Sequence, residues 1–432
     1  MRVMLSLLCL LILLPSFGSA ADWQMTTLDN DLKVMILENH QVPQVNISTT
    51  VRCGAKNETD FFDGATHLLE HLILFRGTEE MTGEELGAAM KKHGAYFNGY
   101  TSSDWTDFVI SLPKENLDFA LKIHADMLFR SNFPAEEMDK ERQAVLEEIN
   151  ITEDNPFGKA YRASLAELFG RKHPYSKNVL GTKENVSGVP RDSVYAYYKR
   201  YYAPNNMTMV IVGDVDAAAT LELVKKYFGG IPKGEVPHDN YSPPVKHKKV
   251  KEIKIEKDIG QAYLLMSMVG PQADSPDQFS LDIMATLLGN GESSRLWKKL
   301  KDEKGLVYNT GFSFYTSKYE GTMFSFALLD PANIPEVEKA INEVLKDVKE
   351  NGFTEEELRK AKNSIKTGHF MSLERGLDIA DKYAQYDSFV GYKFVENYPD
   401  NIENVTLADL NEAARTYLDT DAYVKTMVVP NE

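Results

Sequence analysis

Cysteine is scarce in this chain, and its scarcity excludes a fold held together by disulfides. Only two cysteines occur in 432 residues, too few for a disulfide scaffold. Basic residues are also in deficit, because 48 Lys and Arg face 64 Asp and Glu, which gives a formal net charge of −16. Nucleic-acid binding needs a basic face, so the composition argues against it. The 27 glycines and 18 prolines are too few for a fibrous or low-complexity chain. What remains is a large, acidic, globular protein.

The N-terminus has the three regions of a secretory signal peptide. A short basic start, Met1-Arg2, precedes an apolar run over residues 3–14, and small residues follow up to Ala21. The apolar run is shorter than the roughly 20 residues that span a bilayer. We therefore predict a signal peptide over residues 1–20, cleavage after Ala20 with Ala21 as the alternative, and a periplasmic location. No later run approaches this length, so we expect a soluble mature chain without stable membrane insertion.

The rest of the chain is predicted to form two halves of similar order. Alternating and β-branched stretches predict strands, and longer amphipathic stretches predict helices. In the first half, strands are expected over 32–52, 96–101, 106–112 and 207–212, and helices over 64–75, 82–93, 115–129 and 135–152. In the second half, strands are expected over 252–256, 262–269, 307–315 and 322–328, and helices over 276–288, 293–302, 334–350 and 354–370.

A proline-rich stretch separates these halves and a residue-level repeat relates them. Residues 232–251 have linker composition, which places one domain at 21–231 and a second at 252–432. Residues 132–140 resemble residues 352–360, an offset of 353 − 133 = 220. We therefore predict an α+β protein of two homologous domains, each a mainly antiparallel sheet packed with helices.

The first half carries a motif with metal-ligand spacing, His67-Leu-Leu-Glu70-His71. Residues i, i+3 and i+4 of a helix share one face, so both imidazoles and the carboxylate point the same way. Two histidines at this spacing bind zinc, and a nearby carboxylate can take a proton from water that zinc makes acidic. The order is the inverted zinc-peptidase motif, H-x-x-E-H. An exposed polar face is a poor alternative, because most of the intervening side chains are leucine.

A third ligand is expected from the helix over residues 135–152. Glu141 and Glu148 are seven residues apart and share a face, whereas Glu147 lies about 100° around the axis. Flanking apolar residues favour Glu148 as the ligand and Glu141 as a carboxylate behind the ligands. Glu147 remains an alternative, and so does a plain solvated acidic face.

The second half lacks these candidate ligands. At the offset of 220, Glu141 falls on Ala361, Glu148 on Gly368 and His71 near Gly291. One domain is therefore predicted to be catalytic, while the other completes the chamber.

Taken together, these features resemble the pitrilysin/insulinase family of zinc peptidases, and the length is similar to its mitochondrial processing peptidase-like branch. The segment from Glu141-Arg142 to Glu148 fits the family's spacing for the glutamate ligand, and Asn98-Gly99 before Thr101 resembles a further family signature. Shorter matches are Tyr202-Ala-Pro-Asn205, Gly213-Asp214, Gly289-Asn290 and Ser293-Ser-Arg-Leu296.

The resemblance implies half of a clamshell that encloses unfolded peptides and binds one Zn²⁺ per chain through His67, His71 and Glu148. It also implies that the edge strand near Asn98 and Gly99 binds substrate by backbone pairing. In this family an Arg seven residues before a Tyr reaches the scissile bond from the opposite wall. Here Tyr308 is present, but Lys301 stands where the arginine is expected, which keeps the charge and loses the bidentate fork.

Three functions follow as hypotheses. The first is a secreted zinc endopeptidase in which Glu70 is the general base, with Glu141, Tyr308 and Lys301 assisting. The second is a peptide-binding or assembly subunit that needs a partner chain, and the third is a zinc hydrolase of another class, such as an amidase. Because the family closes its chamber with four domains, we expect a homodimer or a heterodimer with a homologous subunit.

Overall fold

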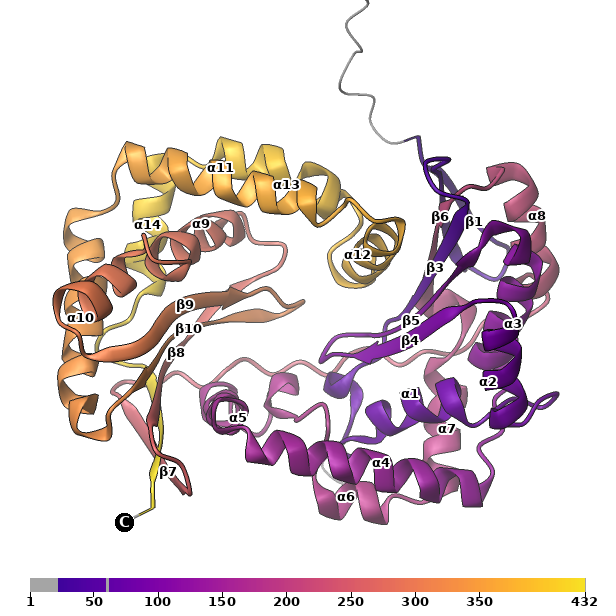
Figure 1. The fold of residues 1–432 in the computed structure, drawn as a ribbon, viewed down its shortest axis with the longest axis horizontal. Coiled ribbons are helices and arrows are strands. Elements are labelled where there is room, and N and C mark those ends of the chain that lie inside the picture. The colour runs from indigo at the N-terminus through magenta and orange to yellow at the C-terminus, as the bar shows by residue number, and fades with distance from the viewer. Residues whose placement is uncertain (1–21, 60–61, 432) are drawn as a thin grey trace, which may run out of the picture.

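The computed structural model describes residues 22–59 and 62–431 (Figure 1). The predicted signal peptide and its cleavage site lie outside the described residues. Among the described helices, none combines the length and the apolar composition that crossing a bilayer requires. The strands are β1 (Gln24–Thr27), β2 (Lys33–Glu38), β3 (Gln44–Val51), β4 (Tyr96–Thr101), β5 (Thr106–Pro113), β6 (Met207–Gly213), β7 (Lys251–Lys257), β8 (Ala262–Gln272), β9 (Val307–Tyr315), β10 (Glu320–Leu329) and β11 (Val424–Pro430).

The helices flank two sheets. In the first half they are α1 (Ala65–Phe75), α2 (Gly83–Lys92), α3 (Leu117–Phe129), α4 (Ala135–Asp154), α5 (Pro156–Phe169), α6 (Lys183–Gly188), α7 (Arg191–Tyr201) and α8 (Ala217–Phe228). In the second they are α9 (Asp277–Gly289), α10 (Ile334–Asn351), α11 (Glu355–Met371), α12 (Gly376–Phe389), α13 (Lys393–Asn404) and α14 (Leu407–Tyr417). The stretch expected to be a helix over residues 293–302 instead holds a π-helical turn, η5 (Trp297–Glu303).

The two sheets have the same topology, which confirms the predicted α+β architecture of two repeated domains. The first sheet runs β1-β2-β6-β3-β5-β4 and the second runs β7-β11-β8-β10-β9. In each sheet one strand pair is parallel, β2 with β6 and β7 with β11, and the other pairs are antiparallel. Strand β1 is the one strand of the first sheet without a counterpart among the described residues of the second.

Both faces of each sheet are covered, and one helix of each half crosses to the other half. Along β6, Met209 and Ile211 face the main core of the first half, while Val210 and Val212 face α12. This alternation follows from the two-residue repeat of a strand. In the same way, Ala160 of α5 packs on the second sheet. Figure 1 shows α12 against the first sheet and α5 beside the second, so the halves exchange helices.

Polar contacts also join the two halves beneath these sheets. Asp104, in the turn between β4 and β5, accepts hydrogen bonds from Lys56 Nζ at 3.2 Å, Tyr175 Oη at 2.8 Å and the Lys318 main-chain N–H at 3.0 Å. Asp239, between α8 and β7, accepts from Lys318 Nζ at 2.5 Å. Burial alone would raise the pKa of Asp239, but Lys56 and the bond from Lys318 lower it to about 2.

Removing the charge of Asp239 should loosen this junction. We expect Asp239→Asn to lower the free energy of unfolding by roughly 1–3 kcal/mol at neutral pH, between exposed and buried ion pairs. The native carboxylate has the lower pKa, so its contribution is complete above about pH 4 and disappears as the pH falls towards 2. Denaturant unfolding at several pH values measures the difference. Asp154→Asn is the control, because Asp154 pairs with Lys257 at an exposed position; an equal loss there would contradict the argument.

Candidate metal centre

The helix that carries the H-x-x-E-H motif is almost entirely buried. Residues 65–74 of α1 are all buried, so the helix end must find internal hydrogen-bond partners. The carboxylate of Glu58 supplies them, accepting from the main-chain N–H groups of Gly64 at 2.8 Å and Thr66 at 2.7 Å. Gly64 adopts a φ of 88° before the helix, a conformation that favours glycine. These contacts fix where the histidines point.

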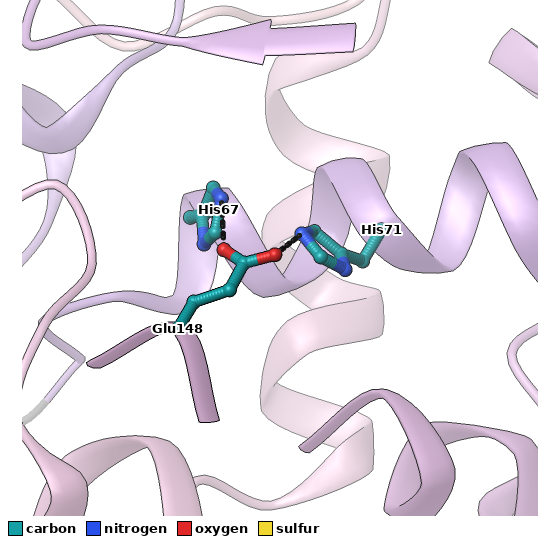
Figure 2. Close-up of side chains that lie close together, drawn as sticks. All are labelled: His67, His71 and Glu148. Carbon is teal, nitrogen blue, oxygen red and sulfur yellow. Dashed lines mark ion pairs between the residues drawn. The ribbon is translucent and has the colours of Figure 1, made fainter. Parts of the chain in front are cut away.

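His67 and His71 lie one turn apart on α1 and both face Glu148 of α4, as Figure 2 shows. The Nε2 atoms of His67 and His71 are each 3.5 Å from a carboxylate oxygen of Glu148. One ligand atom from each residue lies within 4.8 Å of the others. Ligand atoms around a tetrahedral zinc at about 2.0–2.1 Å are roughly 3.3 Å apart, so this donor set fits the ion.

Outer contacts hold His71 in the tautomer that a metal ligand needs. Its Nδ1 lies 2.8 Å from Glu141 Oε2, and Glu141 Oε1 accepts from Arg76 Nε at 2.5 Å. Burial opposes protonation of His71, but the bond to Glu141 and the charges of Glu70 and Glu148 raise its pKa. With Nδ1–H donated to Glu141, the Nε2 lone pair faces Glu148. Glu141 thus lies behind His71, where the sequence placed it.

His67 lacks such a support. Its Nδ1 is buried without a hydrogen-bond partner in the described part of the chain. Burial and the neighbouring His71 lower the pKa of His67 to about 3, so its imidazole is neutral. A neutral imidazole is the form that binds a metal.

Glu70 occupies the position expected of a base. It is 5% exposed, and its Oε2 accepts a hydrogen bond from Thr101 Oγ1 at 2.7 Å. Burial raises the pKa of Glu70 to about 7, which Thr101 and His71 partly oppose. A carboxylate with a pKa near neutrality is suited to general acid–base chemistry.

The structure favours Glu148 over Glu147 as the third candidate ligand. Glu147 is exposed, and its Oε2 accepts a hydrogen bond from Asn150 at 3.3 Å rather than facing the histidines. Glu148 alone of the two reaches His67 and His71. The contacts of Thr101, Arg76 and Glu58 were not predicted as parts of the site. Arg76 follows α1 by one residue, but no local pattern marks it.

Strand β4 passes directly over Glu70 and forms an edge of the sheet. Within the described residues, β4 pairs with β5 alone, which confirms the predicted edge strand near Asn98 and Gly99. A Cβ at Gly99 would lie 2.8 Å from Leu74 Cδ1 and 2.9 Å from Glu70 Oε1. The glycine therefore permits the close approach. Asn98 Nδ2 lies 3.4 Å from Tyr96 Oη on the exposed side.

A side chain at Gly99 should therefore displace Glu70 while leaving His67, His71 and Glu148 in place. For the zinc peptidase expected from the sequence, Gly99→Ala should lower kcat/KM for peptide cleavage about 10–100-fold with normal zinc content, because a misplacement near 1 Å can cost this much. Peptide assays and metal analysis of the same preparation measure both quantities. Gly87→Ala on α2 is the matched control, since no atom lies within 4 Å of its added Cβ. Full activity of Gly99→Ala would show that Glu70 needs no such fit.

Lys301 and Tyr308 lie together in the second domain. Lys301 Nζ donates to the main-chain oxygen of Tyr308 at 2.6 Å and lies 5.5 Å from the ring centre of Trp297. The Tyr308 side chain is exposed. Among the described residues, none of the hydrogen bonds or ion pairs of these two residues involves the His67–His71–Glu148 cluster. Their role at the scissile bond stays a prediction.

Comparison with known proteins agrees with these features. The family model described as insulinase (peptidase family M16) matches residues 33–183, which include the His67–His71–Glu148 cluster. The family model described as the peptidase M16 inactive domain matches residues 188–365. A protein named uncharacterized zinc protease from Mycobacterium leprae is 28% identical over 91% of this chain and 88% of its own length. One of the same description from Bacillus subtilis is 26% identical over 94% of this chain and 98% of its own.

A solved structure shares the fold over nearly all of this chain. The crystal structure of a protease from Helicobacter pylori has a TM-score of 0.89 and 26% identity, covering 95% of this chain and all of that one. The peptidase M16 inactive domain structure from Pseudomonas fluorescens, at 19% identity, has a TM-score of 0.87 over 95% of this chain and 98% of its own, and supports the fold alone. This chain belongs to the pitrilysin/insulinase family, M16, with the metal-binding motif in its first domain and a second domain of the inactive type.

Proposed function

We propose that this protein is a zinc-dependent endopeptidase that hydrolyses peptide bonds in oligopeptides or small unfolded proteins. The observation that carries the proposal is the convergence of His67, His71 and Glu148 with a buried Glu70 one turn away on the same helix. The named zinc proteases among its relatives support the metal. We also propose secretion into a periplasm and kinship with the mitochondrial processing peptidase-like branch, on the grounds of the N-terminal sequence and the length.

In this mechanism His67, His71 and Glu148 hold the ion and Glu141 fixes the orientation of His71. Zinc in this cluster would supply a Lewis acid that polarises the scissile carbonyl and makes water more acidic. Glu70 takes the proton of the attacking water and passes it to the leaving amine. The hydrogen bond from Thr101 to Oε2 of Glu70 orients the carboxylate that receives the proton.

The substrate is proposed to be an extended peptide that pairs with the free edge of β4. Such pairing reads the main chain and not particular side chains, which suits unfolded substrates of varied sequence. A cavity of about 600 Å³ lies beside β4, and its lining includes Tyr96 and Tyr100 of β4, Arg375 just before α12 and Asp378 of α12. Its position between the sheet of one domain and a helix of the other supports a chamber that both halves build.

A second subunit is proposed to complete the chamber. Tyr308 is exposed at the start of β9, and Lys301 of η5 lies beside it. Both side chains are therefore available to face the His67–His71–Glu148 cluster of another chain. A second copy of this chain or a homologous subunit would place them there.

Cleavage of a quenched fluorescent peptide by the purified chain tests the proposed activity. We expect turnover that a zinc chelator abolishes and that stoichiometric zinc restores, because the cluster holds the Lewis acid. The same assay on the isolated chain and on its mixture with a homologous subunit separates the homodimer from the heterodimer. Zinc binding without cleavage under both conditions would reject the peptidase in favour of a peptide-binding subunit.

A further inference from the structure

The second domain has a cavity in the region that corresponds to the His67–His71–Glu148 cluster of the first domain. Helices α9 and α11 and strand β9 correspond to α1, α4 and β4 in the order of the repeat. Between them lies a cavity of about 400 Å³, within the usual range for small-molecule sites. Its lining combines polar and apolar side chains. The aromatic ones are Phe314, Tyr315, Tyr386, Phe394 and Tyr398.

Helix α9 contributes two polar side chains to this cavity. Gln278 and Asp282 lie one turn apart on α9, as His67 and His71 do on α1. Gln278 Nε2 donates to Thr316 Oγ1 at 2.7 Å, just after the end of β9. Helix α9 therefore supplies one carboxylate and one amide to the cavity lining.

Asp282 supplies the carboxylate of the cavity lining. Asp282 Oδ2 accepts from Tyr398 Oη at 2.8 Å and from Gln278 Nε2 at 3.1 Å. Gln278 is 1% exposed, and in the described part of the chain its Oε1 has no hydrogen-bond partner. That oxygen exposes almost no surface to the cavity, so the acceptor open to a ligand is the carboxylate of Asp282, which lines the cavity. A carboxylate and aromatic walls together suit a guanidinium or a primary ammonium group.

Lys382 supplies the basic group of the cavity lining. Lys382 of α12 donates from Nζ to Ser372 Oγ at 2.5 Å, and this is the one hydrogen bond of its three N–H groups within the described residues. His369 stacks on the Tyr398 ring, with ring centres 5.2 Å apart. Burial and the nearby Lys382 lower the pKa of His369 to about 4, so this imidazole is neutral at pH 7. Lys382 thus provides the cationic group that faces a carboxylate.

We propose that this cavity binds a basic amino acid, with its cationic side chain against Asp282 and its carboxylate towards Lys382. The same chemistry is offered by a free amino acid and by the C-terminal residue of a peptide. The site requires no metal and lies in the domain without the metal motif. Binding at this cavity can therefore be tested independently of the peptidase activity.

Calorimetric titration of the metal-stripped full chain tests this site. L-Arginine is the main probe, agmatine lacks the carboxylate, and citrulline lacks the cationic charge. We expect arginine to bind about tenfold or more tightly than either analogue, because each loses one charge-assisted contact. A short peptide with a free C-terminal arginine that binds as arginine does assigns the site to peptide ends, whereas binding of the free amino acid alone assigns it to free arginine. Citrulline binding as tightly as arginine, or no binding of millimolar arginine, overturns the proposal.

Three variants tie the binding to this cavity. Asp282→Asn should weaken arginine about tenfold or more, and Lys382→Met should abolish the preference for arginine over agmatine. Gly368→Leu adds a side chain at the rim, where no atom lies within 4 Å of a new Cβ, and should block binding without a clash. Gly87→Leu on α2 is its matched control. Unchanged arginine affinity in Asp282→Asn and Gly368→Leu would place the binding elsewhere and overturn the proposal, whatever the peptidase assay shows.

Discussion

Replacing Glu70 with glutamine should abolish peptide cleavage while leaving the zinc in place. The amide has the shape of the carboxylate and can still accept the hydrogen bond from Thr101, so α1 and its histidines keep their positions. It cannot accept a proton near neutral pH, whereas burial raises the pKa of Glu70 to about 7. General-base catalysis contributes about 10²–10⁴-fold, and we expect kcat to fall by that factor. Added zinc should restore nothing.

The control for Glu70→Gln is Glu147→Gln, which removes a carboxylate of α4 that does not contact the site. Glu147 is exposed, and its Oε2 contacts Asn150 and not the histidines. Glu147→Gln should keep both zinc content and turnover. Substantial cleavage by Glu70→Gln at full zinc occupancy would assign the proton transfer to another group.

Much of the fold is legible in the sequence because its elements are long and strongly periodic. Strand β9 runs from Val307 to Tyr315, as predicted, and α4 begins at Ala135, as predicted. The sequence analysis did not predict the strands β1 and β11 or the helices α5, α6, α7, α8, α12, α13 and α14. The apolar faces of α5 and α12 pack on the sheet of the opposite half, so no local contact within one half marks these two helices as parts of its core.

The alignment of the two halves shows where a single offset fails. Helices α4 and α11 begin 355 − 135 = 220 residues apart, as the repeat predicts, but α1 and α9 begin 277 − 65 = 212 apart. At the offset of 212, His71 corresponds to Ile283 rather than to a position near Gly291. Insertions between elements change the spacing without changing the topology. The second half still lacks the ligand set, since Phe279 and Ile283 stand at the histidine positions on α9 and Gly368 at the glutamate position on α11.

The candidate site was predictable where its geometry is local and unpredictable where it is not. His67, Glu70 and His71 share one helix face, so spacing alone brings them together. Choosing Glu148 over Glu147 depends on how α4 turns towards α1, which apolar flanks only indicate. Thr101 and Arg76 join the site through the approach of β4 and the end of α1. No residue pattern in either segment specifies those contacts.

Substituting Glu148 by glutamine should remove the metal itself. The neutral amide is a weaker ligand than the carboxylate, and two imidazoles then hold the ion with no charge from α4. We expect zinc affinity to fall by more than the roughly 10–100-fold that loss of an outer-shell partner costs, with cleavage falling in parallel at low zinc. Metal analysis after dialysis and activity titrated against free zinc measure the two effects. Glu147→Gln is again the matched control, one residue away on the same helix.

Zinc dependence separates this variant from the loss of the base. In Glu148→Gln the defect is occupancy, so excess zinc should recover part of the activity, because His67, His71 and Glu70 are unchanged. In Glu70→Gln the ion is already bound and excess zinc has nothing to restore. If Glu148→Gln instead kept one zinc per chain and full turnover, the 3.5 Å contacts from Glu148 to the two histidines would not be ligand geometry. A neighbouring carboxylate such as Glu141 would then have to leave Arg76 to take its place.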